Sequence, residues 1–351
     1  MAQRDPVEAR AQRSRDLYDI ATWEPRSALD RFAVRLYRAV VATGKWVLVL
    51  LAVVFTLAIG AAGALTNEAV LGLTVLSAVP ALALAAYVYR TDITSGEPLG
   101  LLAVTFVLAV IFASFAAVVN TVLGGVVGAV FGTAPTAGGT DTTVLSVLGT
   151  VLFFLLVVGP IEETVKMLAV RFYAYRSERF DAVVDGTVYG AVAGLGFAFV
   201  ENAIYIQRSA GQSLALGAPE QALAEAGVTA AVRALAGPGH VVYSAFAGYY
   251  LGLAKFNREN AGPIVAKGIL IAALIHALYN SLATVVLPVV TGAVPSIPPI
   301  TVYFGFVVVF QGFFGYLLYR KIKTYSAAYR DVMSDAERAD SIGVERTEFD
   351  G

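Results

Sequence analysis

The sequence predicts an all-α, polytopic integral membrane protein. Of its 351 residues, 58% are hydrophobic and only 15% are charged, and the mean hydropathy is +0.71. Soluble domains carry about a quarter charged residues, so this chain has too little polar surface to be a soluble enzyme. Charged residues are also absent from three long stretches, at 99–140, 142–161 and 268–319. Each stretch is long enough for a helix that crosses a bilayer, which needs about 20 apolar residues.

The bulk composition excludes several other classes of protein and site. The sequence has no cysteine, so disulfides, thiolate nucleophiles and Cys-ligated metals are excluded. A metal ion would have to bind His, Glu, Asp or Asn side chains. The formal net charge of −1 gives no general attraction to nucleic acid. The N-terminal residues lack the apolar core of a cleavable signal peptide, so we expect the first span to direct the chain to the membrane.

Windows of about 19 residues with few or no charges identify the individual spans. They predict about eight transmembrane helices, at 46–66, 69–89, 99–121, 146–172, 183–206, 238–255, 264–288 and 300–319. Residues 46–320 are therefore expected to form one transmembrane domain. It lies between an N-terminal segment of residues 1–45 and a charged tail of residues 324–351.

The distribution of positive charge orients the helices, because Lys and Arg are retained on the cytoplasmic side of a membrane. In this topology, 23 of the 25 Lys and Arg residues fall in the termini, loops and helix ends of one side. The other side holds only Arg208 and Arg233. We therefore expect an even number of spans, both termini in the cytoplasm, and a multi-pass protein of the cell membrane.

Four segments beside the spans have expected structures of their own. The glycine-rich continuation of the third span, 122–132, fits a tilted helix, a re-entrant turn or an unwound helix end. In the external segment 207–237, Pro219 opens an Ala/Leu-rich stretch that predicts a short interfacial helix. Residues 27–45 alternate Arg with apolar residues, which predicts an amphipathic juxtamembrane helix bound to anionic lipid. The tail from residue 324 is rich in acids and is expected to be solvated and partly disordered.

A small set of polar side chains lies inside the predicted spans. An ionisable group deep in a span costs at least about 2.5–3.5 kcal/mol, so each one requires a reason. These residues are Glu162, Glu163 and Lys166 in the fourth span, Asp185, Glu201 and Asn202 in the fifth, His240 in the sixth, and His276 and Asn280 in the seventh.

Counting residues along the predicted helices places the ionisable side chains at one depth in the membrane. The fourth and fifth spans form a hairpin, in which Glu162 and Glu201 lie 18 and 21 residues from residue 180. The sixth and seventh spans form a second hairpin, in which His240 and His276 each lie 18 residues from residue 258. At 1.5 Å per residue, all four lie roughly 27–32 Å from their turns. We therefore expect these side chains to converge.

The helix faces agree with this convergence. Three polar or aromatic pairs are spaced i,i+4 and so share a face: Glu162 with Lys166, Phe197 with Glu201, and His276 with Asn280. Glu163 is rotated by about 100° from Glu162, so the two carboxylates can serve two roles at one site. A stripe of small residues on the fifth span predicts close helix packing rather than chemistry: Gly186, Gly190 and Gly194.

Several motifs follow one another in order along residues 160–280. They are Glu-Glu-x-x-Lys at 162–166, Asp-Gly-x-x-Tyr-Gly at 185–190, Gly-x-Gly-Phe-x-x-x-Glu-Asn at 194–202, His240, and His-x-x-x-Asn at 276–280. Together they resemble the PrsW family of intramembrane proteases, which is similar to the CAAX-type prenyl endopeptidase group. In that larger group a histidine stands where this chain has Glu201.

The resemblance implies peptide-bond hydrolysis within the membrane. The residues that match the functional positions are Glu162, Glu163, Glu201, His240 and His276, with Asn280 as a further catalytic candidate. The supporting positions are Lys166, Phe197, Asn202 and Asp185. The implied partners are the lipid bilayer and a membrane protein or lipid-anchored peptide as substrate, with no nucleic acid.

Two mechanisms fit these residues. In a metal version, neutral His240 and His276 hold Zn²⁺ together with Glu163 or Glu201, and Glu162 acts as the general base. In a metal-free version, Glu162 activates water directly, and His240, His276 or Asn280 stabilises the oxyanion. The His-Glu-x-x-His signature of zinc proteases is absent, and the residues alone do not choose between the two versions.

Structural roles compete with the catalytic ones. Glu162 and Lys166 fit an intrahelical ion pair, and a single histidine in a membrane helix is usually a hydrogen-bonded packing residue. Asp185, near the cytoplasmic end, is expected to cap the fifth span or to pair with Arg179. Two further polar residues in the spans are most simply interhelical hydrogen-bonding residues: Asn120 and Gln311.

Two other functions compete with a protease. A proton-coupled transporter also uses buried Glu and His residues, and it would be favoured by inverted repeats or paired broken helices, which the sequence does not show. A non-catalytic membrane scaffold would keep the fold and lose the activity. The complete set of motif residues argues against that scaffold.

Overall fold

The computed structural model describes residues 5–10, 16–39, 68–94, 96–132 and 143–347. The described residues contain an isolated bridge between Tyr18 and Thr22 and no β-strand. The all-α prediction is therefore confirmed. The first predicted span, 46–66, lies outside the described residues.

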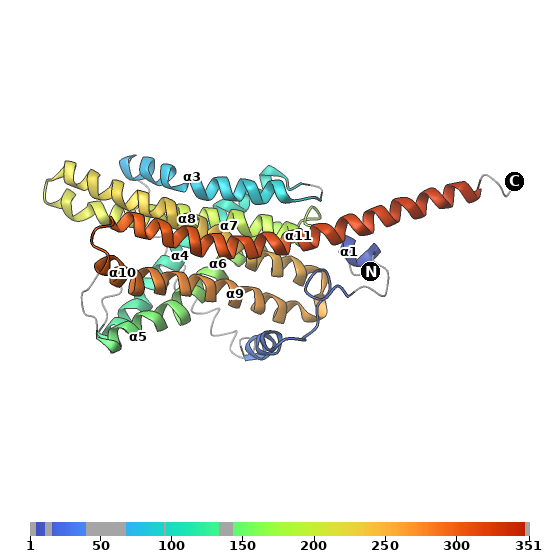
Figure 1. The fold of residues 1–351 in the computed structure, drawn as a ribbon, viewed down its shortest axis with the longest axis horizontal. Coiled ribbons are helices and arrows are strands. Elements are labelled where there is room, and N and C mark those ends of the chain that lie inside the picture. The colour runs from blue at the N-terminus through green and yellow to red at the C-terminus, as the bar shows by residue number, and fades with distance from the viewer. Residues whose placement is uncertain (1–4, 11–15, 40–67, 95, 133–142, 348–351) are drawn as a thin grey trace.

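Long helices that run roughly along one axis make up the molecule (Figure 1). In chain order they are α1 (Pro6–Arg10), α3 (Glu68–Thr91), α4 (Leu99–Phe131), α5 (Val144–Phe153), α6 (Gly159–Phe172), α7 (Val183–Ala215), α8 (Pro219–Phe256), α9 (Ala261–Ser281), α10 (Leu287–Ala293) and α11 (Pro299–Thr347). Residues 28–39 are also helical. Within the described residues, six helical stretches are long and apolar enough to cross a membrane, which confirms a polytopic membrane protein. The total of eight spans and the orientation of the termini stay predictions.

Helix α7 is the central helix of the bundle, and it packs along α8 over most of its length. Its glycine stripe explains the close approach. A Cβ atom on Gly186, Gly190 or Gly194 would collide with backbone carbonyl oxygens of α8. The predicted packing role of this stripe is therefore confirmed. The last of these oxygens belongs to His240, so the stripe also sets the distance between α7 and a site residue.

Two wider π-turns interrupt the long helices beside prolines. The turn η2 (Phe154–Val158) joins α5 to α6 just before Pro160, and η5 (Leu282–Val286) joins α9 to α10 just before Pro288. Proline lacks a backbone N–H and clashes with the preceding turn, and a π-turn is one way for a continuous helix to accept it. The fourth predicted span therefore changes from a π-turn to an α-helix at Gly159, three residues before Glu162.

The structure corrects the expected short interfacial helix. A helix does begin at Pro219, as predicted, but it continues without a break through Pro238 to Phe256. The reason is packing: the small residues of its first turns bury one face against the end of α7. These small residues are Ala222, Ala226 and Ala230, which contact Ile206 and Ala210. Residues 219–237 are thus one arm of the α7/α8 hairpin.

Two other segments are more regular than expected. Helix α4 passes through the glycines of 122–132 without a break and ends at Gly132, whose φ is +67°. Helix α11 continues through most of the tail that was expected to be partly disordered (Figure 1). In that tail Tyr325, Ala328 and Val332 share one face and are buried, an amphipathic pattern that the acid content obscures.

The N-terminal segment is tied to one end of the bundle by buried and half-buried ion pairs. Asp19 pairs with Lys267 at 2.9 Å and with Lys321 at 2.8 Å, and Asp30 pairs with Lys267 at 2.8 Å. Asp5 accepts hydrogen bonds from the N–H of Val183 and from the hydroxyl of a tyrosine on α11. These contacts connect the segment to α7, α9 and α11.

The glycine stripe generates a stability prediction. Replacing Gly190 with Ala places a methyl group against the backbone of α8, and we expect a loss of about 1–3 kcal/mol in the free energy of unfolding. Gly211 on the same helix has open space around its Cα. Gly211→Ala is therefore the matched control, and we expect it to be neutral or stabilising by up to about 1 kcal/mol. Thermal unfolding in detergent measures both, and equal transition temperatures for the two variants would contradict the packing role.

Candidate functional site

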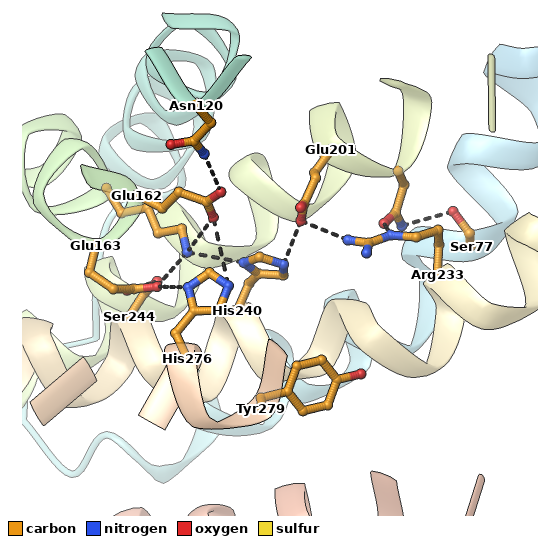
Figure 2. Close-up of polar contacts among 12 residues, drawn as sticks. Ser77, Asn120, Glu162, Glu163, Glu201, Arg233, His240, Ser244, His276 and Tyr279 are labelled. Carbon is orange, nitrogen blue, oxygen red and sulfur yellow. Dashed lines mark hydrogen bonds and ion pairs between the residues drawn. The ribbon is translucent and has the colours of Figure 1, made fainter. Parts of the chain in front are cut away.

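The polar residues of the four central helices come together in the middle of the bundle (Figure 2). Helix α6 supplies the two adjacent glutamates and the lysine, α7 supplies the third glutamate, and α8 and α9 supply one histidine each. These residues are Glu162, Glu163, Lys166, Glu201, His240 and His276. All of them except Glu201 are buried. The convergence expected from helical arithmetic is therefore what the structure shows.

Glu163 is the more deeply buried of the two adjacent glutamates, and all of its contacts are with protein groups. Its Oε1 lies 2.6 Å from Nζ of Lys166 and 3.0 Å from Nδ1 of His276. Its Oε2 accepts a hydrogen bond of 3.3 Å from Ser244. Glu163 thus neutralises the buried lysine and fixes the orientation of the His276 ring.

Glu162 has one oxygen engaged and one free. Asn120 on α4 donates a hydrogen bond of 2.9 Å to Oε1. Oε2 is buried and has no hydrogen-bond partner among the described residues. It lies 3.8 Å from Nε2 of His276 and 3.9 Å from Nζ of Lys166. A buried carboxylate oxygen without a partner is costly, so this atom is the part of the site that most needs a ligand or a proton.

His240 is held from both sides of its ring. Nζ of Lys166 lies 3.0 Å from Nδ1, and Oε2 of Glu201 lies 2.6 Å from Nε2. Since an ammonium group only donates, the hydrogen-bond geometry assigns Nδ1 as acceptor and Nε2–H as donor to Glu201. Phe197 stacks on the imidazole with a centroid distance of 5.6 Å. It also lies under the ammonium of Lys166 at 4.3 Å, which accounts for its place in the motif.

Glu201 is in turn anchored by Arg233 of α8. The guanidinium NH2 lies 2.7 Å from Oε2 of Glu201, and Nε donates a hydrogen bond of 2.9 Å to Oδ1 of Asn202. Asn202 continues the chain of contacts by donating to Oγ of Ser77 on α3. Asn202 is therefore a supporting residue that holds the arginine in place.

The cluster has one more carboxyl group than cations. With both histidines neutral and all three glutamates ionised, the three carboxylates would exceed Lys166 and Arg233 by one negative charge, which a bound cation or a proton on Glu162 would neutralise. The free oxygen belongs to Glu162, and single donor atoms of Glu162, His240 and His276 all lie within 4.8 Å of one another. One carboxylate and two imidazoles are a donor set that suits Zn²⁺ and leaves a position for water. These three side chains therefore suit a metal ion, which would take the place of Lys166 or Glu201 at one ring nitrogen of His240.

A cavity of about 670 Å³ adjoins the cluster. Its wall includes Asn120, Glu162, Glu201, His240 and Asn280, whereas Glu163, Lys166 and His276 lie behind the wall. The volume is typical of ligand pockets, which span roughly 300–1,000 Å³. The 100° rotation between the two adjacent glutamates thus directs one toward the cavity and the other toward the protein interior.

Two of the predicted site residues stand apart from the charged cluster. Asn280 lines the cavity but makes no hydrogen bond to a described residue. Asp185 lies at the beginning of α7, where it accepts hydrogen bonds from the N–H groups of Asp181 and Ala182. Of the two structural roles expected for Asp185, capping of the fifth span and pairing with Arg179, the structure shows capping. It groups with Asp92 and Glu97 rather than with the central site.

The sequence did not indicate that two further residues, Asn120 and Arg233, belong to the cluster. Asn120 was expected to be an interhelical hydrogen-bonding residue, and the structure shows that its partner is Glu162. Arg233 was assigned to an external loop, although its side chain is only 11% exposed and pairs with Glu201. One signal pointed to it: Arg208 and Arg233 are the only two positive residues on the side of the chain that should lack them.

Comparisons with known proteins agree with the resemblance seen in the motifs. The family model described as PrsW family intramembrane metalloprotease matches residues 97–313, which is more than half of the chain. None of the solved structures is significantly similar to this chain.

Three curated relatives are named Protease PrsW. The protein of Halalkalibacterium halodurans is 31% identical over 124 residues, which is 35% of this chain and 51% of the relative. The protein of Clostridioides difficile is 31% identical over 126 residues, covering 35% and 48%. The protein of Bacillus subtilis is 30% identical over 127 residues, covering 36% and 51%. The matched region thus spans about half the length of these relatives.

The partly exposed ion pair between Glu201 and Arg233 generates a stability prediction. Removal of one partner leaves the other charge in the cavity wall without its counter-ion, so we expect Arg233→Met and Glu201→Gln each to cost about 1–3 kcal/mol of unfolding free energy. The double variant should cost clearly less than the sum of the two single variants. Thermal unfolding of all four proteins in detergent measures this coupling. Strictly additive losses would show that the pair is not a unit.

Proposed function

The chain belongs to the PrsW family of intramembrane metalloproteases, and we propose that it hydrolyses a peptide bond of a membrane-associated protein inside the helix bundle. One observation carries this proposal: Glu162 is a carboxylate in the cavity wall with one oxygen that forms no hydrogen bond to any described residue. A peptide that enters the cavity meets this group beside an oriented imidazole. The transporter and scaffold alternatives gain no support from the family and its relatives.

Glu162 handles the proton of the attacking water. Asn120 holds Oε1, which leaves Oε2 to accept a proton from water and later to pass it to the leaving amine. General acid and base catalysis by a positioned group of this kind contributes about 10²–10⁴-fold to a rate. A carboxylate with both oxygens engaged, such as Glu163, is less suited to this role.

Glu163, behind the cavity wall, and Glu201, in the wall, orient the reacting groups. Glu163 fixes the His276 ring through Nδ1, which directs Nε2 toward Glu162. Glu201 fixes the ring of His240 through Nε2. In the metal version of the mechanism, the sequence predicts Glu163 or Glu201 as the carboxylate ligand. The contacts favour a different arrangement, in which both are orienting groups and Glu162 is the carboxylate closest to the two imidazoles.

When a metal ion is bound, Glu162, His240 and His276 would hold it, and it would supply Lewis-acid chemistry to the water and the substrate carbonyl. In that case Oε2 of Glu162 would be a ligand and not the base, because one oxygen atom cannot hold the ion and take the proton. Zn²⁺ is the ion that this set of one carboxylate and two imidazoles suits best. The excess negative charge of the cluster also favours a cation at this position.

Asn280 is the best candidate for stabilising the oxyanion. It lines the cavity with Glu162 and His240, and its carboxamide makes no hydrogen bond to a described residue. A side-chain N–H that is free and already in place can donate to the negative oxygen that develops on the substrate carbonyl.

The two adjacent glutamates should respond differently to substitution. We expect Glu162→Gln to lower cleavage by at least about 100-fold, since it loses the acid and base, while thermal stability stays close to that of the wild type. Glu163→Gln should lower both cleavage and stability, because Lys166 loses its ion-pair partner.

Cleavage can be measured without a known substrate. Purified protein in detergent is incubated with peptides from a digested membrane-protein fraction, and new peptide ends are mapped by mass spectrometry. Glu225→Gln, an acid of α8 outside the cavity wall, is the matched control and should keep wild-type activity. A fully active Glu162→Gln protein would contradict the proposed function.

Metal content tests the ligand assignment. We expect about one Zn²⁺ per chain in protein purified without chelators, and its loss in Glu162→Ala, His240→Ala and His276→Ala. Glu163→Gln should keep the zinc but bind it about 10–100-fold more weakly, because it orients a ligand rather than being one. Elemental analysis and competition with a chelator measure both quantities. An active preparation that lacks metal would instead leave Glu162 as a base acting on water alone.

A further inference from the structure

Two positive residues break the charge asymmetry of this chain. In the predicted topology, only Arg208 and Arg233 of the 25 Lys and Arg residues fall on the side that membrane insertion normally keeps free of positive charge. Both side chains line the cavity beside Glu162. Because positive charge on this side works against the normal topology, each of the two arginines requires a reason within the cavity.

Arg233 has an ion-pair partner among the described residues, whereas Arg208 has none. Arg233 pairs with Glu201 at 2.7 Å, and its guanidinium lies 4.6 Å from the centre of the Tyr205 ring. The exposed side chain of Arg208 forms no ion pair with any residue that the structure describes. It is therefore a cation in the cavity wall that is available to a ligand.

The position of Arg208 relates it to the reacting groups. Glu201, Tyr205 and Arg208 are spaced i, i+4 and i+7 on α7, so they share one face, and all three line the same cavity. The seven residues from Glu201 to Arg208 place Arg208 about 10 Å along α7 from Glu201, which contacts His240 beside Glu162. An extended peptide advances about 3.3 Å per residue, so this distance corresponds to roughly three substrate residues.

We propose that Arg208 is a specificity-determining residue that binds an acidic side chain of the substrate about three residues from the scissile bond. This inference rests on the proposed function. A guanidinium offers a planar pair of donors that matches a carboxylate. Because the side chain of Arg208 is exposed, water weakens this ion pair and we expect a modest preference. The acidic residue would lie on the side of the scissile bond that points toward the end of α7 and the beginning of α8.

The peptide assay described above tests this preference directly. Peptides cut by the wild-type protein should be enriched in Asp or Glu two to four residues from the cut on one side. A cleaved sequence is then synthesised as a pair that differs only by Asp or Asn at that position. We expect the Asp peptide to have a kcat/KM about fivefold higher, mainly through a lower KM, as for a half-exposed ion pair.

Variants of Arg208 decide whether this residue is responsible. Arg208→Gln should reduce the ratio of the two kcat/KM values to about one, and Arg208→Lys should keep part of it. Arg208→Glu should reverse the preference in favour of a Lys peptide of the same sequence. Reversal by a charge swap is a result that a purely structural role would not produce.

Four outcomes would overturn the inference. The first is an absence of acidic enrichment, and the second is an Asp preference that persists in Arg208→Gln. The third is an effect of Arg208→Gln that disappears in detergent and appears only as a changed response to phosphatidylglycerol when the protein is reconstituted into lipid vesicles, which would show that the residue binds a lipid phosphate instead. The fourth is an absence of any cleavage above the Glu162→Gln blank, which would overturn the proposed function together with this subsite.

Discussion

The site depends on one fully buried ammonium group. Nζ of Lys166 lies 2.6 Å from Glu163 and 3.0 Å from His240, and the lysine side chain has no exposed surface. In a low-dielectric interior each of these interactions is stronger than in water, and an unpaired charge would be very costly. One lysine therefore draws together residues of α6 and α8. Because it can only donate, it also determines which nitrogen of His240 carries the proton.

The backbone geometry that permits this arrangement comes from glycine and proline. Glycines on α7 let that helix approach the carbonyl oxygens of α8, so that Glu201 reaches the outer nitrogen of His240. On α6, the Cβ of a residue at position 159 would lie 2.6 Å from the carbonyl oxygen of Ala273, so Gly159 lets α6 pack against α9. The π-turn and Pro160 then restart the helix directly before the two glutamates. Small residues and a local change of helix type thus position the large polar ones.

Much of the site could be predicted from the sequence because a helix has a fixed rise and rotation. Counting residues from two turns placed Glu162, Glu201, His240 and His276 at one level, and the 100° rotation separated the two adjacent glutamates. Counting could not say which glutamate faces the cavity, since that depends on where α4 and α9 pack. It also missed the role of Arg233, because the α7/α8 hairpin extends further than the hydropathy of its ends indicates.

The uncompensated charge of the cluster connects its stability with its proposed chemistry. Three carboxylates and two cations leave one negative charge, and the free Glu162 oxygen lies next to His276 and to the cavity. A protein that only needed a stable helix bundle would gain by replacing this carboxylate with an apolar residue. A site that must bind a cation, or take a proton from water and return it, needs an oxygen that the protein leaves without a hydrogen bond. The oxygen that is costly to bury is therefore also the one that lets the site react.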